Sequence, residues 1–258
     1  MNSRPSTRTA TRRNPLARLL SDHYAQGTVT EVDMVTATMV RVRIHSEEVP
    51  NWDYTPGQHV RVQINDPLSL YGIFRPGETL RTYTIWDRSV EKCEFELRAH
   101  LYGGDGIGLS WLRNVAVGDE LTYWGPQGDF AVKNAQFHLF AVEETGACGI
   151  APLLRELPAQ AQVYGVIESA SPDDEPPVPG PHRLGRAYRG TASAASSEVL
   201  LAAVKQLDLP TDGGAAYLVG EARTCQAIRS HLLNDRGWDR KAIIVKPFWT
   251  PGKRGLHH

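Results

Sequence analysis

The pattern of apolar residues changes about halfway along the 258-residue chain, and this change limits the folds that the chain can adopt. Between residues 24 and 133, apolar and polar residues alternate in short segments such as 38–44, 58–64 and 93–99. Period-two alternation is typical of strands with one buried face, and many such strands separated by turn residues favour an antiparallel barrel or sandwich. The first half is therefore predicted to be an antiparallel β domain.

The second half has nearly continuous apolar runs, as buried parallel strands do. Strands are expected at 137–142, 163–167, 215–219 and 242–245, and helices at 152–157, 196–207 and 221–234, with a glycine-containing loop before the first helix and a proline-rich surface loop at 171–187. Strands that alternate with helices indicate a parallel α/β layer. The predicted organisation is an arm at 1–22, a β-barrel domain at 23–134 and an α/β domain at 135–258.

Composition excludes several classes of function. The formal net charge is −1, without the broad basic excess of a nucleic-acid-binding protein. Three widely spaced cysteines argue against a disulfide framework or an iron–sulfur module and favour a reducing compartment, so a cytoplasmic location is expected. No apolar stretch reaches the 18 residues of a membrane span, and the arginine-rich start lacks the apolar core of a signal peptide.

The segment Arg81-Thr82-Tyr83-Thr84 resembles the Arg-x-Tyr-Ser/Thr strand that builds the flavin site of the ferredoxin-reductase superfamily. The resemblance implies that all four residues bind FAD. A guanidinium can hold the diphosphate and a phenol can stack on the isoalloxazine. A small hydroxyl can reach the N5/O4 edge, so Thr84 and Tyr83 are expected at the catalytic centre. The alternative is an ordinary packed strand.

A second segment, residues 100–111, resembles the family's glycine-rich stretch that leads into a helix. Such a helix start offers backbone N–H groups to a diphosphate. The FAD-binding residues implied here are His100, Gly106, Ile107, Gly108, Leu109, Ser110 and Trp111. A flexible hairpin for the glycines and an ordinary core or surface imidazole for the histidine remain open. Gly125-Pro126-Gln127-Gly128-Asp129-Phe130 resembles the family's closing turn, with a mainly structural role.

The segment from Glu144 to Pro152 follows the first expected parallel strand and resembles the superfamily's nicotinamide-binding glycine turn. The carboxyl end of such a strand is where a dinucleotide belongs. Thr145 and Cys148 are therefore implied as cofactor-binding residues, although a buried small side chain is an equal alternative for the cysteine. Glu168 could bind a ribose hydroxyl, whereas the nearby Arg183, Arg186 and Arg189 could meet a 2′-phosphate, so NADH and NADPH both stay open.

Two further segments resemble the siderophore-interacting branch of the superfamily. They are residues 219–222 and 246–252, in which Phe248 and Thr250 depart from the family pattern. They imply that Glu221 and Trp249 contact the cofactors, although an ordinary core tryptophan is an equal alternative for Trp249. A basic rim would attract anionic ferric siderophores, and the expected substrate-binding residues are Lys246, Lys253 and Arg254. The chelator already fills the coordination shell of the iron, so no metal site of the protein's own is expected.

The resemblance as a whole implies an FAD-dependent ferric-siderophore reductase. Electrons are expected to pass from NADH or NADPH through FAD to the ferric siderophore, and the cofactor supplies the redox chemistry that side chains lack. Ferredoxin is open as another donor. Three alternative functions remain: an NAD(P)H:flavin or ferredoxin-type reductase, a flavin-bearing siderophore-binding accessory protein without turnover, and a purely structural module. No nucleic acid and no membrane are expected as partners.

Overall fold

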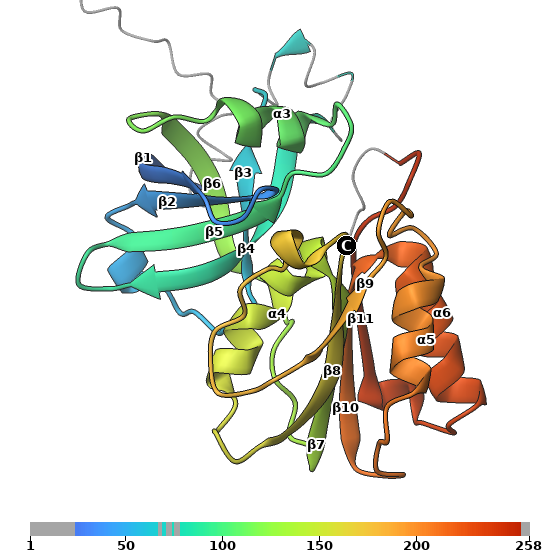
Figure 1. Cartoon of the computed structure of the whole chain (residues 1–258). Coiled ribbons are helices and arrows are strands. Elements are labelled where there is room, and N and C mark those ends of the chain that lie inside the picture. Colours follow the sequence, from blue (N-terminus) through green and yellow to red (C-terminus); the bar gives the residue numbers. More distant parts are fainter. Residues whose placement is uncertain (1–23, 67–68, 71–73, 75–77, 254–258) are drawn as a thin grey trace, which may run out of the picture.

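The computed structural model describes residues 24–66, 69–70, 74 and 78–253. The predicted arm at 1–22 and the predicted substrate residue Arg254 lie outside the described residues. Figure 1 shows two layered units that follow one another along the chain.

A closed antiparallel barrel forms the first unit, as the alternating pattern predicts. Its strands are β1 (Tyr24–Met34), β2 (Met39–His45), β3 (His59–Gln63), β4 (Leu80–Ser89), β5 (Glu94–His100) and β6 (Glu120–Gln127), in the spatial order β1-β2-β5-β4-β3-β6. Inward-facing residues such as Val42, Val60 and Leu97 are fully buried. Helix α3 (Ile107–Asn114) packs Trp111 and Leu112 against this barrel core.

A five-stranded parallel sheet forms the second unit, in the order β11-β10-β7-β8-β9. Its elements are β7 (Phe137–Glu143), α4 (Glu144–Glu156), β8 (Gln162–Ser169), β9 (Gly185–Tyr188), α5 (Glu198–Lys205), β10 (Gly214–Glu221), α6 (Ala222–Asn234) and β11 (Ile243–Trp249). Helix α4 covers the sheet face nearer the barrel, while α5 and α6 cover the opposite face (Figure 1). The predicted fold class, a β-barrel followed by a parallel α/β layer, is confirmed.

Two local predictions in the second half are wrong. Helix α4 begins at Glu144 directly after β7, so the expected glycine loop before a helix at 152–157 does not exist. Gly146 lies inside this helix. Only glycine fits at this position, because a Cβ would overlap the carbonyl oxygen of Val219 on β10. The predicted surface loop at 171–187 also contains part of β9, a short strand that pairs with β8.

Helix α4 also joins the two units. A small buried cluster combines Met39 and Trp86 of the barrel with Cys148 and Ala151 of α4. The guanidinium of Arg98 lies over the Trp86 ring, 4.1 Å from its centroid. Cation–π contacts of this kind add to apolar burial. The carboxyl edge of the sheet is therefore fixed next to the barrel, and the candidate site lies at this junction.

Candidate functional site

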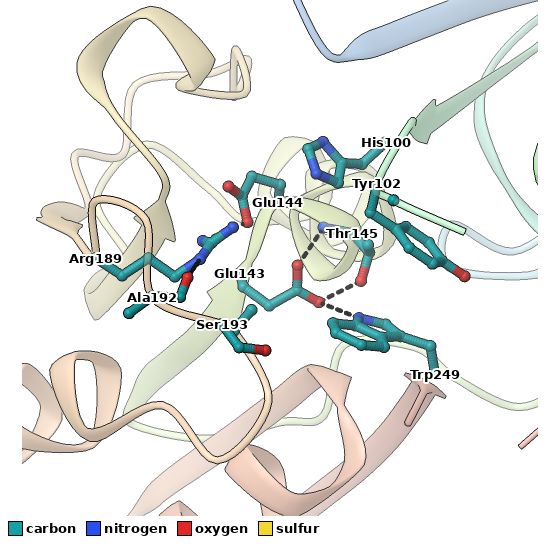
Figure 2. A pocket seen from close by; sticks show the side chains of 11 residues that line it. His100, Tyr102, Glu143, Glu144, Thr145, Arg189, Ala192, Ser193 and Trp249 are labelled. Atoms are coloured by element: carbon teal, nitrogen blue, oxygen red, sulfur yellow. Dashed lines mark hydrogen bonds and ion pairs between the residues drawn. The ribbon is translucent and has the colours of Figure 1, made fainter. Parts of the chain in front are cut away.

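A cavity of about 300 Å³ opens where the carboxyl ends of the parallel strands meet the barrel. Its lining comes from the end of β5, the junction of β7 and α4, the loop after β9 and the end of β11, and consists of His100, Tyr102, Gly103, Glu143, Glu144, Thr145, Arg189, Ala192, Ser193, Ala194 and Trp249. Figure 2 shows these side chains converging from both units. Ligands of open α/β sheets bind in the crevice outside the carboxyl ends of the strands.

Three rings form one wall of this cavity. His100 lies 6.4 Å from Tyr102, and Tyr102 lies 5.2 Å from Trp249, measured between ring centroids. Their planes differ by only 24° and 19°, so the rings form a stacked row that crosses from the barrel to the sheet. The Nδ1 atom of His100 is buried without a hydrogen-bond partner among the described residues, and burial lowers the pKa of this imidazole. The row lines this side of the cavity with aromatic side chains.

Glu143, the last residue of β7, is 2% exposed at the base of the cavity. It accepts a hydrogen bond from the backbone N–H of Thr145 at 2.8 Å and another from the Thr145 hydroxyl. The indole Nε1–H of Trp249 donates to the same carboxyl group at 3.1 Å (Figure 2). Burial raises the pKa of Glu143 to about 7. This carboxyl group therefore caps helix α4 and fastens Trp249 at the same time.

Arg189 lies beside two further buried carboxylates. Its guanidinium is 2.8 Å from Glu144 and 3.4 Å from Glu168. Glu144 also accepts the backbone N–H of Ala170 at 2.8 Å, and the Ser197 hydroxyl donates to Glu168. Glu168 is fully buried and is not part of the cavity lining. Its contacts with Arg189 and Ser197 hold the loop after β9 in place. Among the sequence candidates for cofactor preference, only Arg189 lines the cavity.

The Arg81–Thr84 segment lies on β4, next to β3. Opposite residues of an antiparallel pair share a face, and Arg81 and Tyr83 pair with Val62 and Val60 of the barrel core. Both reach the end of the barrel that α3 covers. The Tyr83 hydroxyl donates to the carbonyl of Gly108 at 3.2 Å, and burial raises its pKa. The Tyr83 ring lies 5.3 Å from Trp111.

The remaining two residues of this segment point the other way. Thr82 is exposed, whereas Thr84 is 6% exposed although it lies on the outer face of the barrel. Helix α4 contacts β4 here, which accounts for the burial. Thr84 and Tyr83 therefore point to opposite faces of β4, and their catalytic roles stay predictions.

The glycine-rich segment meets this strand at the start of α3. A Cβ on Gly108 would come within 3.0 Å of the Tyr83 hydroxyl and 3.1 Å of the Arg81 Cγ, so the glycine allows close packing of helix and strand. By contrast, Gly103 and Gly106 face open space. Gly106 is the N-cap of α3 and has no side-chain capping bond. The structure thus brings together the two segments that the sequence singles out for FAD, including Ile107, Leu109, Ser110 and Trp111 of α3.

Other predicted site residues lie apart from the cavity. Cys148 is buried against Met39 and Trp86, and burial raises the pKa of its thiol to about 12. The Lys246 ammonium lies 4.7 Å from the centroid of the Phe130 ring, and burial lowers its pKa to about 8. Lys253 is exposed but is not part of the lining. Neither of these two lysines lines the cavity, and their role in substrate binding stays a prediction.

Phe130 of the predicted closing turn is buried in the core of the α/β unit, beside Tyr217. Its place there fits the structural role expected for this turn.

The sequence alone does not single out several of the lining residues. Glu143 carries a local signal, since a polar residue between an apolar strand and a helix suggests a cap. For Arg189 the sequence suggests only a 2′-phosphate, and no local signal shows its actual partners. It follows Glu144 by 45 positions and Glu168 by 21. Only the folded sheet brings these charges together.

Comparison with known proteins bears on the family and the fold. Residues 135–252 match the family model of the siderophore-interacting proteins. They form a siderophore-interacting protein domain. Ferric vibriobactin reductase ViuB of Vibrio cholerae serotype O1 is a homologue, 24% identical over 234 residues that cover 85% of this chain and 86% of ViuB. The resemblance found in the motifs is thus confirmed.

Solved structures show the same fold across both units. A siderophore utilization protein from T. fusca superposes with a TM-score of 0.79 at 23% identity, covering 91% of this chain and 95% of that one. The flavohem-like FAD/NAD-binding domain of nitric oxide dioxygenase from Vibrio cholerae gives a TM-score of 0.64 at 20% identity, over 89% and 100%. Both units together therefore have the fold of these proteins.

Proposed function

We propose that this protein is an FAD-dependent reductase of ferric siderophores that takes electrons from NADH or NADPH. The family match, the homology to ViuB and the fold support a siderophore-related flavin reductase. The observation that carries the proposal is the meeting of Arg81 and Tyr83 with Gly108 at the start of α3. Two segments that lie 25 positions apart in the sequence are thus in direct contact.

The residues at this place fit a flavin dinucleotide. The first turn of α3 has no side-chain cap, and its N–H groups and dipole favour a diphosphate. Arg81 adds a positive charge beside it. The loop from His100 to Gly106 connects this helix start with the aromatic wall of the cavity. Arg113 steadies the loop through bonds to the carbonyls of Gly104 and Tyr102, at 2.8 and 3.0 Å.

The roles of the chain follow from this placement. In this proposal Arg81 and the α3 backbone hold the diphosphate, and the rings of Tyr102 and Trp249 line the cavity. FAD held by these residues would supply the redox chemistry that side chains lack, namely hydride acceptance and one-electron transfer. Oxygen ligands hold Fe(II) more weakly than Fe(III), so reduction favours release of the iron. Stacking of Tyr83 on the flavin, contacts of Thr84 and a cytoplasmic location remain predictions.

No helix among the described residues is long and apolar enough to cross a membrane. The described residues also contain no group of three or more His, Cys, Asp or Glu side chains that could hold a metal ion. In the proposed reaction the iron of the ferric siderophore is the substrate.

A test combines cofactor and substrate in one experiment. Purified protein reconstituted with FAD is mixed with NADH or NADPH without air, and the visible spectrum is followed before and after addition of a ferric siderophore. Bleaching of the flavin, then recovery of colour with formation of Fe(II), supports the proposal. Flavin that bleaches but does not reoxidise with any ferric chelate points to another reductase. Protein that cannot bind FAD contradicts the proposal.

A second candidate donor, ferredoxin, is favoured by one observation. The N-terminus of α4, where a nicotinamide dinucleotide would place its diphosphate, is already occupied by the carboxyl group of Glu143, and Glu144 lies in the first turn. These acids lower the attraction of the helix start for another anion. If reduced ferredoxin reduces the bound flavin much faster than NADH or NADPH does, ferredoxin is the donor.

A further inference from the structure

Strands β7 and β10 end in the same way. Each finishes with a buried glutamate, Glu143 and Glu221, with exposures of 2% and 0%. Each carboxyl group caps the helix that follows, accepting from Thr145 N at 2.8 Å and from Thr224 N at 2.9 Å. Capping alone does not require glutamate, since shorter polar side chains cap helices well.

The other oxygen of each carboxyl group is directed at the end of β11. Trp249 donates its Nε1–H to Glu143 Oε1 at 3.1 Å, and Thr250 donates its hydroxyl to Glu221 Oε1 at 2.9 Å. Two consecutive residues are thus fastened to two neighbouring strands. A buried carboxyl group needs such donors, because burial without partners is costly.

These bonds determine the orientation of Trp249. An indole has a single hydrogen-bond donor, so one partner is enough to select its rotation. With Nε1 bound to Glu143, the ring stacks on Tyr102 of the barrel, 5.2 Å away at an interplanar angle of 19°. The indole then forms part of the cavity wall (Figure 2). Its position depends on the sheet through Glu143 and on the barrel through Tyr102.

We propose that Glu143 is a positioning residue that holds the Trp249 indole on Tyr102, and that this placement sets the affinity of the cavity for a ring-bearing electron donor. The proposal deepens the proposed reductase function and rests on it. Without the carboxyl acceptor, the indole occupies several positions, and only a fraction of the molecules presents the competent wall. The apparent dissociation constant rises as that fraction falls.

Two variants remove the same bond from opposite sides. Glu143→Asp keeps a carboxylate that caps α4 but withdraws it by one methylene from the indole. Trp249→Phe keeps an aromatic ring beside Tyr102 but removes the N–H donor. Glu198→Asp is the matched control, because it makes the same change in the first turn of α5 at an exposed position.

The first measurement does not depend on function. The chain has six tryptophans, and the ¹⁹F NMR signal of Trp249 in 5-fluorotryptophan-labelled protein is the one that disappears in Trp249→Phe. Glu143→Asp should shift or broaden this signal and leave the others in place, whereas Glu198→Asp should change none. An unmoved Trp249 signal in Glu143→Asp overturns the proposal, even if the protein is an active reductase.

The second measurement is a double-mutant cycle on FAD-loaded protein, with KM and kcat for NADH and NADPH. Each single variant should raise KM about 10-fold, the size expected from one lost hydrogen bond, with a smaller effect on kcat. The double variant should be no worse than either single variant, because both remove one interaction. Additive losses, or a shifted ¹⁹F signal with unchanged KM, contradict the proposal. Absence of FAD binding in the wild-type protein contradicts the proposed function instead.

Discussion

Replacement of Gly146 by alanine tests why α4 lies so close to the sheet. An alanine gains about 1 kcal/mol over glycine inside a helix. The new Cβ, however, would overlap the carbonyl oxygen of Val219 and approach the Cβ of Val142 within 3.0 Å. Overpacking costs about 1–3 kcal/mol, and a backbone neighbour in a central strand cannot move aside as a side chain can. We therefore expect Gly146→Ala to destabilise the protein by about 2 kcal/mol despite its better helix propensity.

Gly149→Ala, one turn further along α4, is the matched control. Its Cβ would meet the Phe248 ring at 2.8 Å, and this half-buried side chain can shift. Its cost should therefore be smaller than that of Gly146→Ala. Thermal unfolding followed by circular dichroism measures both, and a difference of 2 kcal/mol corresponds to roughly 4–8 °C in Tm. If Gly146→Ala unfolds at the Tm of the wild-type protein or above it, α4 does not approach β10 as closely as described.

Three further predictions concern buried groups. In the folded protein Glu143 keeps its proton up to about pH 7, whereas in the unfolded chain it does so only up to about pH 4.5. The free energy of unfolding of wild type relative to Glu143→Gln should therefore fall as the pH rises from about 4.5 to about 7. A difference in urea titrations that does not change with pH contradicts this. Arg189→Met leaves the buried carboxylates of Glu144 and Glu168 without a positive partner, so the free energy of unfolding should fall by about 3–5 kcal/mol. A fall of less than about 1 kcal/mol, measured by thermal unfolding, refutes the assigned pairing. Burial raises the thiol pKa of Cys148 and Cys225, so Ellman's reagent should label only half-buried Cys93 quickly in the native protein; fast labelling of a second thiol would disprove this.

Most of the architecture could be predicted because hydrophobic periodicity reports burial directly. Segment 38–44 alternates because Val40, Val42 and Ile44 face the barrel core. Strand β10 and helix α6 differ from the expected 215–219 and 221–234 by one or two residues at their ends. Such ends depend on capping, which the periodicity does not describe.

The start of α4 could not be predicted from local preference. Gly146, Gly149 and Pro152 are residues that disfavour helices, yet all three lie within α4. The two glycines are explained by contacts with β10 and β11 across the sheet, which a linear pattern does not contain. For Pro152 the structure shows burial beside the same sheet and no further reason.

The candidate site was only partly predictable for the same reason. Side chains within one segment, such as Arg81 and Tyr83, are recognisable from their spacing. The link between Glu143 and Trp249 joins residues 106 positions apart and depends on strand order. Lys246 also depends on the fold. Its charge suggests a surface rim, but the structure places its ammonium group over the Phe130 ring.

Titration of the apoprotein with FAD shows whether β4 and α3 together form an FAD site. We expect saturable binding at one FAD per chain, with a perturbed visible spectrum. Arg81→Ala should weaken this binding at least 10-fold, whereas Arg61→Ala, an exposed change on the adjacent strand, should not. If the wild-type chain does not bind FAD, or if Arg81→Ala binds it equally well, β4 and α3 do not form the site.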